Sequence, residues 1–592
     1  MNRGSVVQAL AAVAAISILT VAAPVRAKHA PRQFNLVETT IPAIHEAIED
    51  GIITPEQLVR MYQRRIAAYD GPATAAHLNS YIHLNEHARA DAEDREEGGE
   101  GEDGERHDGH HRRPLQGIPM ILKDNIDTRN MPTTAGSVAF KGSFPRTDAF
   151  VTRKLRAAGA IILGKATMTE FANFLTNGMP SGYSSLGGYG FNPYDPRPDP
   201  RTGPLAFDAF GRPFNDGRQA LTPGGSSSGP GIAVAANLAE VGIGTETSGS
   251  ILSPGTANGL VGIKPTVGLI SRDGIIPITA DQDTAGPLAR TVTDAAIVLG
   301  AIAGFDPNDP ATAACLLPGN CFSDYTQFLH KNALKGARIA VPPFPANRAT
   351  VMNNAIAVLQ AQGATVTLIP ALAAQLPGCP SRPPAANYPP LAGCSTVLNY
   401  GFKRDLNKYI ADHVRASFPI HSLQDVVNFN IAFGPGATKY DQDLAIFSSL
   451  FDTGPLSADT LRYLSDRATD ISLSHAAILS VLNGPDGIAG TADDVDALLF
   501  SGNSGAATPA KAGFPSIVVP GGVFQNVVTP PFPAGFNAKD GPAGVTFSGR
   551  AFSEPRLIAL AYAFEQATHL RTPPFSAPPL KSDTVIKKHD EN

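Results

Sequence analysis

The chain has 592 residues, of which 43% are hydrophobic and 17% are charged, so it carries ample apolar material for one large core. Its 47 basic and 53 acidic residues give a net charge of −6. Nucleic acid is therefore not favoured as a partner, because a phosphate backbone requires a basic face.

Residues 1–27 have the pattern of a secretory signal peptide. Arg3 gives a positive start, an apolar stretch runs from Val6 to Ala23, and Val25-Arg26-Ala27 forms a cleavage site before Lys28. The alternative is a retained membrane anchor. No later segment offers ~18 uninterrupted apolar residues. We therefore expect a periplasmic or secreted mature chain, residues 28–592, without stable membrane insertion.

The four cysteines agree with export. Cys315 and Cys321 lie close together in the sequence, as do Cys379 and Cys394. Local pairing would give two disulfides with the shortest loops, and four free thiols are the alternative. Neither pair has the spacing of a redox or zinc site.

The N-terminal part contains a helical region and a polar insert. Residues 34–92 are predicted to be helical, with a helix that starts at Thr54. Residues 93–113 hold no apolar residue, which predicts a disordered loop. Three histidines in that loop suggest weak metal binding, although a solvated tether is the preferred interpretation; they are His107, His110 and His111. Residues 572–592 are expected to form a C-terminal tail.

Strands and helices alternate through the rest of the chain. The predicted strands cover 117–122, 160–164, 241–244, 337–341, 365–369 and 516–520. The predicted helices cover 151–158, 230–238, 353–362 and 554–568, with a helical segment over 370–480. This alternation predicts an α/β fold, a single large domain with a mixed, mostly covered central β-sheet surrounded by many helices.

Two long segments lack periodicity. Residues 182–222 are rich in Pro, Gly and Asp, and their aromatic residues suggest that the segment folds onto the body of the protein. One position for it is over the mouth of an active site. Residues 521–544 form a second Pro/Gly-rich connection.

Two Gly/Ser-rich stretches, residues 224–229 and 242–251, sit inside otherwise ordered sequence. Such stretches let the backbone approach a ligand closely and align N–H groups. A serine there needs a base to become a nucleophile, and no histidine lies near. The remaining candidate is Lys123, which follows an apolar run, because burial lowers the pKa of a lysine. From this pattern alone, a surface or salt-bridged lysine is the preferred interpretation.

Several motifs occur together in one order along the chain. They are Lys123-Asp124-Asn125, Gly224-Gly225-Ser226-Ser227, the stretch from Gly244 to Ile251, the stretch from Gly262 to Gly268, the stretch from Asp283 to Arg290, and the stretch from Gly544 to Arg550 followed by Ser553-Glu554-Pro555. In this set the chain resembles the amidase signature family, in the branch that includes peptide amidases. The resemblance covers most of residues 34–571. It implies an amidase-signature fold, a small-molecule or peptide amide as substrate, and neither metal nor cofactor.

The resemblance also implies a catalytic triad. Ser250 takes the position of the nucleophile, Ser226 that of a relay serine in a cis peptide after Gly225, and Lys123 that of the base. The oxyanion hole would be formed by backbone N–H groups of Thr247, Ser248, Gly249 and Ser250. The chain departs from the family pattern at flanking positions, namely Ser228, Pro230 and Ser248, which affects substrate detail. The substrate-binding residues and the oligomeric state cannot be read from the sequence.

Other interpretations remain open. Residues 225–229 also match a Gly-x-Ser-x-Gly nucleophile elbow centred on Ser227, which would make the chain an α/β-hydrolase esterase, although Pro223 argues against the required strand. A non-catalytic binding or assembly protein on an amidase scaffold is another alternative. Gly242-Ile243-Gly244 does not have the spacing of a dinucleotide-binding site. The acidic loop 486–496 contains oxygen ligands for Ca²⁺ but lacks EF-hand spacing, so a plain surface loop is preferred.

Overall fold

The computed structural model describes residues 32–96, 113–372 and 395–587. The predicted signal peptide, the three histidines of the polar insert, and Cys379 and Cys394 lie outside the described residues. Within those three ranges, no helix combines the length and the apolar character that crossing a bilayer requires.

The α-helices are α1 (Ile41–Glu49), α2 (Pro55–Tyr69), α3 (Ala88–Glu96), α4 (Phe150–Ala157), α5 (Ser228–Ala235), α6 (Leu252–Ala257), α7 (Val292–Ile302), α8 (Ala349–Ala361), α9 (Thr396–His413), α10 (Leu423–Phe433), α11 (Asp443–Ser449), α12 (Ala458–Leu482), α13 (Ala507–Ala512) and α14 (Glu554–Thr568). The strands are β1 (Arg32–Asn35), β2 (Tyr81–Leu84), β3 (Pro119–Lys123), β4 (Ile161–Ala166), β5 (Tyr183–Ser184), β6 (Gly188–Tyr189), β7 (Val241–Glu246), β8 (Val261–Lys264), β9 (Thr284–Ala289), β10 (Arg338–Val341), β11 (Thr365–Leu368), β12 (Ala497–Ser501), β13 (Ser516–Phe524), β14 (Gly541–Ser548) and β15 (Thr584–Lys587).

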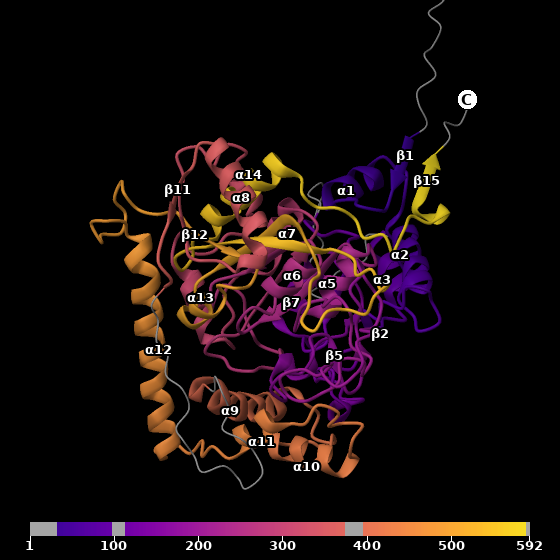
Figure 1. Cartoon of the computed structure of the whole chain (residues 1–592). Helices are drawn as coiled ribbons and strands as arrows, with labels where there is room; N and C mark the ends of the chain where they lie inside the picture. Colours follow the sequence, from indigo (N-terminus) through magenta and orange to yellow (C-terminus); the bar gives the residue numbers. More distant parts are fainter. Residues whose placement is uncertain (1–31, 97–112, 373–394, 588–592) are drawn as a thin grey trace, which may run out of the picture.

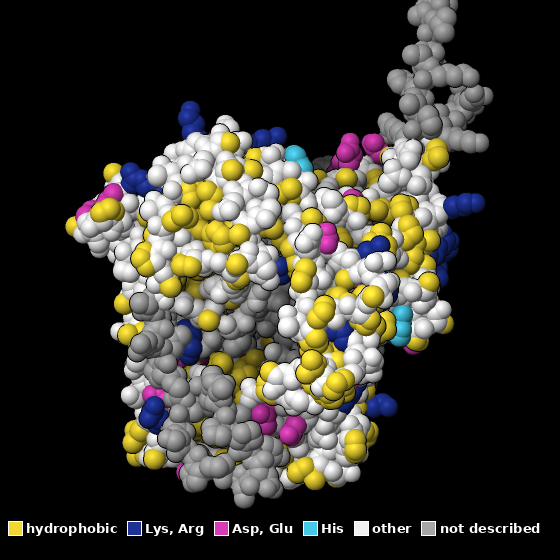
Figure 2. Space-filling view, viewed as in Figure 1, with side chains coloured by type: hydrophobic (Ala, Val, Ile, Leu, Met, Phe, Trp, Pro, Cys, Tyr) yellow, Lys and Arg dark blue, Asp and Glu magenta, His cyan; other side chains and the backbone are white. Residues whose placement is uncertain are grey.

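A mixed sheet of 11 strands runs through the described part of the chain, in the order β11-β10-β12-β14-β13-β8-β9-β7-β3-β4-β2. Strand β3 pairs in parallel with β4 and β7, whereas β8, β9, β13 and β14 join antiparallel. Helices surround this sheet, with α8 and α14 at the top of Figure 1 and α9 to α11 at the bottom. The predicted mixed, covered sheet is confirmed. Figure 2, which has the same viewpoint as Figure 1, shows a hollow in the surface above α9 and beside α12.

Local signals in the sequence explain several of these elements. Thr54 caps α2, because its hydroxyl accepts from the Gln57 N–H and the Gln57 side chain accepts from the Thr54 N–H. All residues of β3 and β4 are buried, as expected for strands that are covered on both faces. The prediction that residues 34–92 are wholly helical is wrong, because β1 and β2 also form there.

Other predicted boundaries also need correction. Residues 93–96, predicted to be disordered, belong to α3, whose alanines at 88 and 92 are buried. The segment 182–222 is not wholly irregular, since β5 and β6 form a short antiparallel pair within it. In the predicted connection 521–544, β13 extends to Phe524 and β14 begins at Gly541.

The two long irregular segments pack against each other. Arg197 donates to the carbonyl oxygens of Phe536 and Asn537, and its guanidinium lies 4.0 Å from the centre of the Phe536 ring. Arg201 donates to the carbonyl of Pro530 in the same way. Arginines of the 182–222 segment therefore fix the connection between β13 and β14.

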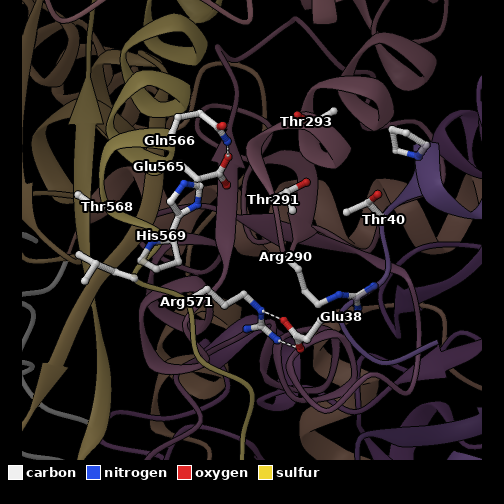
Figure 3. A pocket seen from close by; sticks show the side chains of 13 residues that line it. Glu38, Thr40, Arg290, Thr291, Thr293, Glu565, Gln566, Thr568, His569 and Arg571 are labelled. Atoms are coloured by element: carbon white, nitrogen blue, oxygen red, sulfur yellow. Dashed lines mark hydrogen bonds and ion pairs between the residues drawn. The ribbon is translucent and has the colours of Figure 1, made fainter. Parts of the chain in front are cut away.

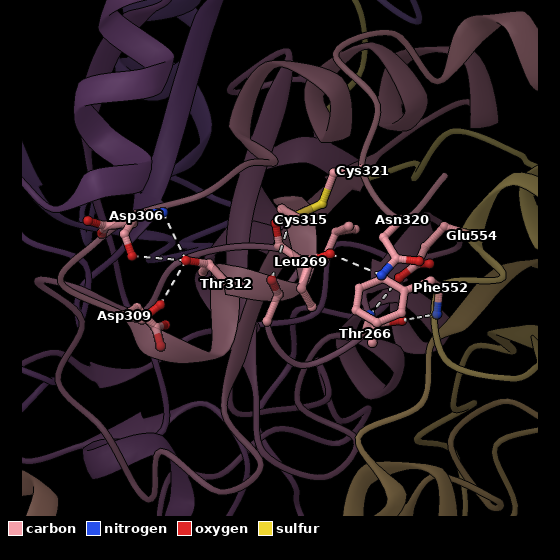
Figure 4. The surroundings of a disulfide bond; sticks show 12 residues. Thr266, Leu269, Asp306, Asp309, Thr312, Cys315, Asn320, Cys321, Phe552 and Glu554 are labelled. Atoms are coloured by element: carbon pink, nitrogen blue, oxygen red, sulfur yellow. Dashed lines mark hydrogen bonds between the residues drawn. A yellow bond between two sulfur atoms is a disulfide. The ribbon is translucent and has the colours of Figure 1, made fainter. Parts of the chain in front are cut away.

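A disulfide joins Cys315 and Cys321, which confirms one of the two predicted pairs. Cys315 lies in a 3₁₀ segment (Pro310–Leu316), and its Sγ is 3.6 Å from the carbonyl oxygens of Gly268 and Leu269 (Figure 4). The bond thus closes a short loop that packs on the segment following β8.

The C-terminal residues up to Lys587 are part of the fold and not a loose tail. Strand β15 pairs antiparallel with β1, next to the N-terminus of the described chain (Figure 1). Arg65 on α2 is fully buried, and it donates to the Asp583 carboxylate and to the carbonyls of Ala577 and Pro578. Residues 577–583 are therefore anchored to α2 by a buried cation.

Candidate active site

Lys123 ends β3 and is fully buried. Its Nζ donates to Ser226 Oγ at 2.8 Å, to Thr245 Oγ1 at 2.8 Å and to the Thr245 carbonyl oxygen at 3.1 Å. It forms no ion pair with another described residue. The interpretation of Lys123 as a surface or salt-bridged lysine is therefore wrong.

Burial controls the protonation of this amine. Desolvation lowers the pKa of Lys123 to about 7, although the carboxylates of Asp283 and Glu246 act in the opposite direction. A substantial fraction of the side chain is then uncharged near neutral pH. The uncharged amine has two protons, which can serve the two Thr245 oxygens, and its lone pair can then accept the proton of the Ser226 hydroxyl.

The first Gly/Ser stretch brings Ser226 to this amine. The Gly225–Ser226 peptide bond is cis, as the resemblance implied, and the Ser226 carbonyl accepts from the Thr169 N–H at 3.1 Å. Gly224 has a φ of +69°, and a Cβ there would lie 2.7 Å from the Ser253 backbone. The stretch needs glycine because it passes so close to the segment that carries Ser250.

Ser250 lies in the turn between β7 and α6. Its carbonyl accepts a hydrogen bond from the Ser227 N–H at 3.3 Å, so it adjoins the residue that follows Ser226. Its hydroxyl makes no hydrogen bond to another residue in the described ranges. The structure thus brings Lys123, Ser226 and Ser250 from three separate segments to one place.

The turn that carries Ser250 is built around the Glu246 carboxylate. This carboxylate accepts from the N–H groups of Gly249 at 2.7 Å, Ile251 at 2.7 Å and Leu252 at 3.0 Å. The Gly249 N–H is therefore already engaged, and we remove Gly249 from the expected set of oxyanion donors. The N–H groups of the other three residues in that set, Thr247, Ser248 and Ser250, have no partner among the described residues.

Ser227, the centre of the alternative nucleophile elbow, has a structural role. It is fully buried, and its hydroxyl donates to the Thr245 carbonyl at 3.1 Å and accepts from the Thr245 N–H at 3.2 Å. No strand forms over residues 216–223, where the elbow requires one. The elbow interpretation is therefore wrong.

Sequence reasoning missed several residues that shape the site. Asn125 donates to Thr245 Oγ1 at 3.1 Å and to the Ile276 carbonyl at 3.1 Å, so it orients the hydroxyl that accepts from Lys123. Thr245 and Glu246 lie in the motif from Gly244 to Ile251. Their contacts, with Lys123 and with the Gly249 N–H, depend on how the turn folds and not on residue spacing. Asp283 also begins a quoted motif, and nothing in its spacing indicated that it contacts Thr247.

Two cavities lie away from the residues around Lys123. One of about 410 Å³ includes Glu38, Arg290 and Arg571 in its lining, and Figure 3 shows Arg571 paired with Glu38. Arg290 follows the end of β9, opposite the end that pairs with Glu246. The other, of about 820 Å³, is lined by residues around β2. Neither is lined by the residues around Lys123.

No group of three or more His, Cys, Asp or Glu residues suited to a metal is found in the described part of the chain. In the acidic loop 486–496, the carboxylates are already engaged. Asp486 accepts from the Ile488 N–H, and Asp494 accepts from the Gly490 N–H and pairs with Arg550. Residues 485–490 are exposed, as expected of a surface loop.

Comparison with known proteins identifies the family. The model of the amidase family matches residues 57–377. This chain belongs to the amidase signature family. A peptide amidase from Stenotrophomonas maltophilia is 36% identical with a TM-score of 0.72, over 92% of this chain and 99% of that one. A probable amidase of Arabidopsis thaliana is 34% identical over 550 residues, 91% of this chain and 92% of its own length.

A third similar protein is an amidase family protein from Bacillus anthracis, 31% identical with a TM-score of 0.72, over 91% of this chain and 92% of that one. The predicted family, the α/β fold with its mixed sheet and the class of enzyme are confirmed for this amidase.

Proposed function

We propose that this amidase hydrolyses C–N amide bonds with Ser250 as nucleophile, Ser226 as proton relay and Lys123 as base. The observation that carries the proposal is the contact of 2.8 Å between a fully buried amine, Lys123 Nζ, and Ser226 Oγ, beside the turn that holds Ser250. The non-catalytic scaffold is less favoured, because this contact places a base beside a hydroxyl. Peptide amides are the substrates to test first, since the Stenotrophomonas protein is named a peptide amidase.

Each attack passes protons along the relay, with a net transfer of one proton to Lys123. Ser250 Oγ attacks the carbonyl carbon of the amide while its proton passes to Ser226 Oγ, and the Ser226 proton passes to the neutral Lys123 amine. The protonated Lys123 then returns a proton through Ser226 to the leaving nitrogen. The C–N bond breaks, ammonia or an amine leaves, and an ester to Ser250 remains. Water then attacks this ester while its proton passes through Ser226 to Lys123. The proton returns through Ser226 to Ser250 Oγ as the ester C–O bond breaks and the carboxylic acid leaves.

Backbone N–H groups would stabilise the negative oxygen of each tetrahedral intermediate. The candidates are those of Thr247, Ser248 and Ser250, which have no partner among the described residues. A donor in such a position contributes ~3 kcal/mol to the transition state of comparable enzymes. The side chains and backbone of the protein supply each proton transfer and each stabilising contact in these steps.

We also propose that the protein acts outside the cytoplasm, in the periplasm or after secretion. The support is the signal-peptide pattern of residues 1–27 together with the Cys315–Cys321 bond, since disulfides persist in oxidising compartments. N-terminal sequencing of exported protein tests the expected start at Lys28.

The decisive experiment compares Ser250→Ala with Ser227→Ala. A fluorophosphonate probe reports the nucleophile, and release of ammonia from a panel of peptide and aryl amides reports turnover. We expect Ser250→Ala to lose labelling and to reduce kcat on the order of 10³-fold or more. Ser227→Ala is the matched control, because it removes a neighbouring buried hydroxyl and should still be labelled.

Two outcomes would overturn the proposal. Labelling that persists in Ser250→Ala but disappears in Ser227→Ala would restore the elbow. A folded wild-type protein that is neither labelled nor active on any amide would favour a binding or assembly role.

A further inference from the structure

The turn at residues 247–250 is held by the neighbouring strand β9 as well as by the Glu246 carboxylate inside it. Strands β7 and β9 pair antiparallel with Glu246 opposite Thr284, so the next residues outward, Thr247 and Asp283, face each other. The Thr247 hydroxyl donates to Asp283 Oδ1 at 2.5 Å. Asp283 Oδ2 accepts from the N–H groups of Ile278 and Thr279 at 2.8 and 3.0 Å. Asp283 therefore ties the turn to the segment 278–283.

A second contact acts on the Thr247 backbone. Gln282 is almost fully buried, and its Nε2 donates to the Thr247 carbonyl oxygen at 3.2 Å. In a trans peptide unit the N–H points away from the C=O. A bond that fixes the Thr247 carbonyl therefore also fixes the direction of the Ser248 N–H, which belongs to the same peptide plane.

The Ser250 N–H, the next donor without a partner among the described residues, is also fixed through the carbonyl of its own peptide plane. The Gly249 carbonyl accepts from the Ser253 N–H at 2.7 Å, which sets the peptide plane that carries the Ser250 N–H. Helix α6 thus orients one donor. The plane that carries the Ser248 N–H is instead fixed by a side chain of another segment, because the Thr247 carbonyl accepts from Gln282.

We infer that Gln282 is a positioning residue, which holds the Thr247–Ser248 peptide so that the Ser248 N–H points at the oxyanion, while Asp283 fixes the adjoining Thr247 side chain. The inference rests on the proposed function. Gln282 acts through the backbone of Thr247 and needs no contact with substrate. Its effect belongs in the tetrahedral intermediate and the transition state that leads to it, because the bound substrate carries no oxyanion.

The test is Gln282→Met, which keeps the length of the side chain and removes the N–H donor. We expect kcat to fall about 10–100-fold with KM changed less than about threefold, because a misaligned donor affects the transition state. Fluorophosphonate should still label the variant to full stoichiometry, but more slowly. Thr247→Val should show the same pattern, and Thr247→Ser should restore most of kcat because it keeps the hydroxyl.

A matched control separates positioning from general stability. Gln442 is also a buried glutamine whose Nε2 donates to a backbone carbonyl at 3.2 Å, that of Val427, but it lies between α10 and α11. Gln442→Met should lower thermal stability and leave kcat within about twofold of wild type. An equal loss of kcat in both variants would overturn the inference.

The pH profile supplies a second readout. Lys123 faces the carboxylates of Asp283 and Glu246, and Asp283 in turn faces Asp405 and Arg272. Burial raises the pKa of Asp283 to about 7, so above that pH its carboxylate carries a negative charge that raises the pKa of Lys123. Asp283→Asn removes this charge, so the upper part of the rising limb of the rate should move to lower pH. Gln282→Met changes no charge and should leave that limb in place.

The two proposals fail in different ways. If Ser250→Ala loses activity and labelling but Gln282→Met keeps kcat within twofold of wild type, only the positioning role is overturned. A shift of the pH limb in Gln282→Met would also contradict it. If Ser250→Ala stays active and labelled, the proposed function itself fails, whatever Gln282→Met does.

Discussion

Lys123 derives its chemistry from its surroundings. Free lysine is almost wholly protonated near neutral pH, whereas this amine is enclosed by β3, β7 and the first Gly/Ser stretch, and its hydrogen bonds go to hydroxyl and carbonyl oxygens. The motifs were enough to name Lys123, Ser226 and Ser250. They did not reveal that the Glu246 side chain folds back to occupy the Gly249 N–H, because residue spacing does not encode the direction of a side chain within a turn.

At the same scale we predict the pH dependence of the rate. The pKa of Lys123 is lowered to about 7 and the active form is the neutral amine, so kcat/KM should rise about tenfold between pH 6 and pH 8 and then level. Initial rates on one amide at constant ionic strength give the profile. A flat profile over this range, or full activity of Lys123→Ala, would contradict the role of Lys123 as base.

At the scale of elements, strong local signals gave the best predictions. Helix α14 was predicted with its observed bounds, Glu554–Thr568, and the start of α2 followed from its capping box. Strands β8 (VGIK) and β9 (TAGPLA) were missed because glycine, proline and polar residues interrupt their apolar residues, so neither shows a continuous apolar run. Their place in the sheet depends on pairing with distant strands.

The loop closed by Cys315 and Cys321 allows a prediction about stability. Replacing both cysteines with serine should lower the free energy of unfolding by about 2 kcal/mol, as expected from the chain entropy released by a loop with a sequence separation of 6. Thermal unfolding of the variant and of wild type, with and without reductant, measures this. A midpoint of the double variant below that of oxidised wild type would agree; equal midpoints for the two would not.

At the scale of the whole molecule, the first and last described segments hold each other. Strand β15 pairs with β1, and the buried Arg65 of α2 binds Asp583 just before β15. Patterns along the chain could not show this, because the partners are more than 500 residues apart.

We predict that Asp583→Asn lowers the free energy of unfolding by about 3 kcal/mol, because it leaves the charge of Arg65 buried without its counter-ion. Asp412→Asn is the control, since Lys408 and Asp412 form an exposed pair on α9 and should matter little. Chemical denaturation of both variants compares them. Equal effects would show that the burial of Arg65 adds nothing to the worth of its ion pair.

The pairing of β1 with β15 has a topological consequence. Arg32 lies opposite Lys587 in the ladder, so the two ends of the described chain stand a strand's width apart. A linker of a few residues that replaces 1–31 and 588–592 would be long enough to join Lys587 to Arg32 without displacing either strand. New ends could then be opened at an exposed loop such as 486–490, and the order of the 11 strands in space would stay as it is.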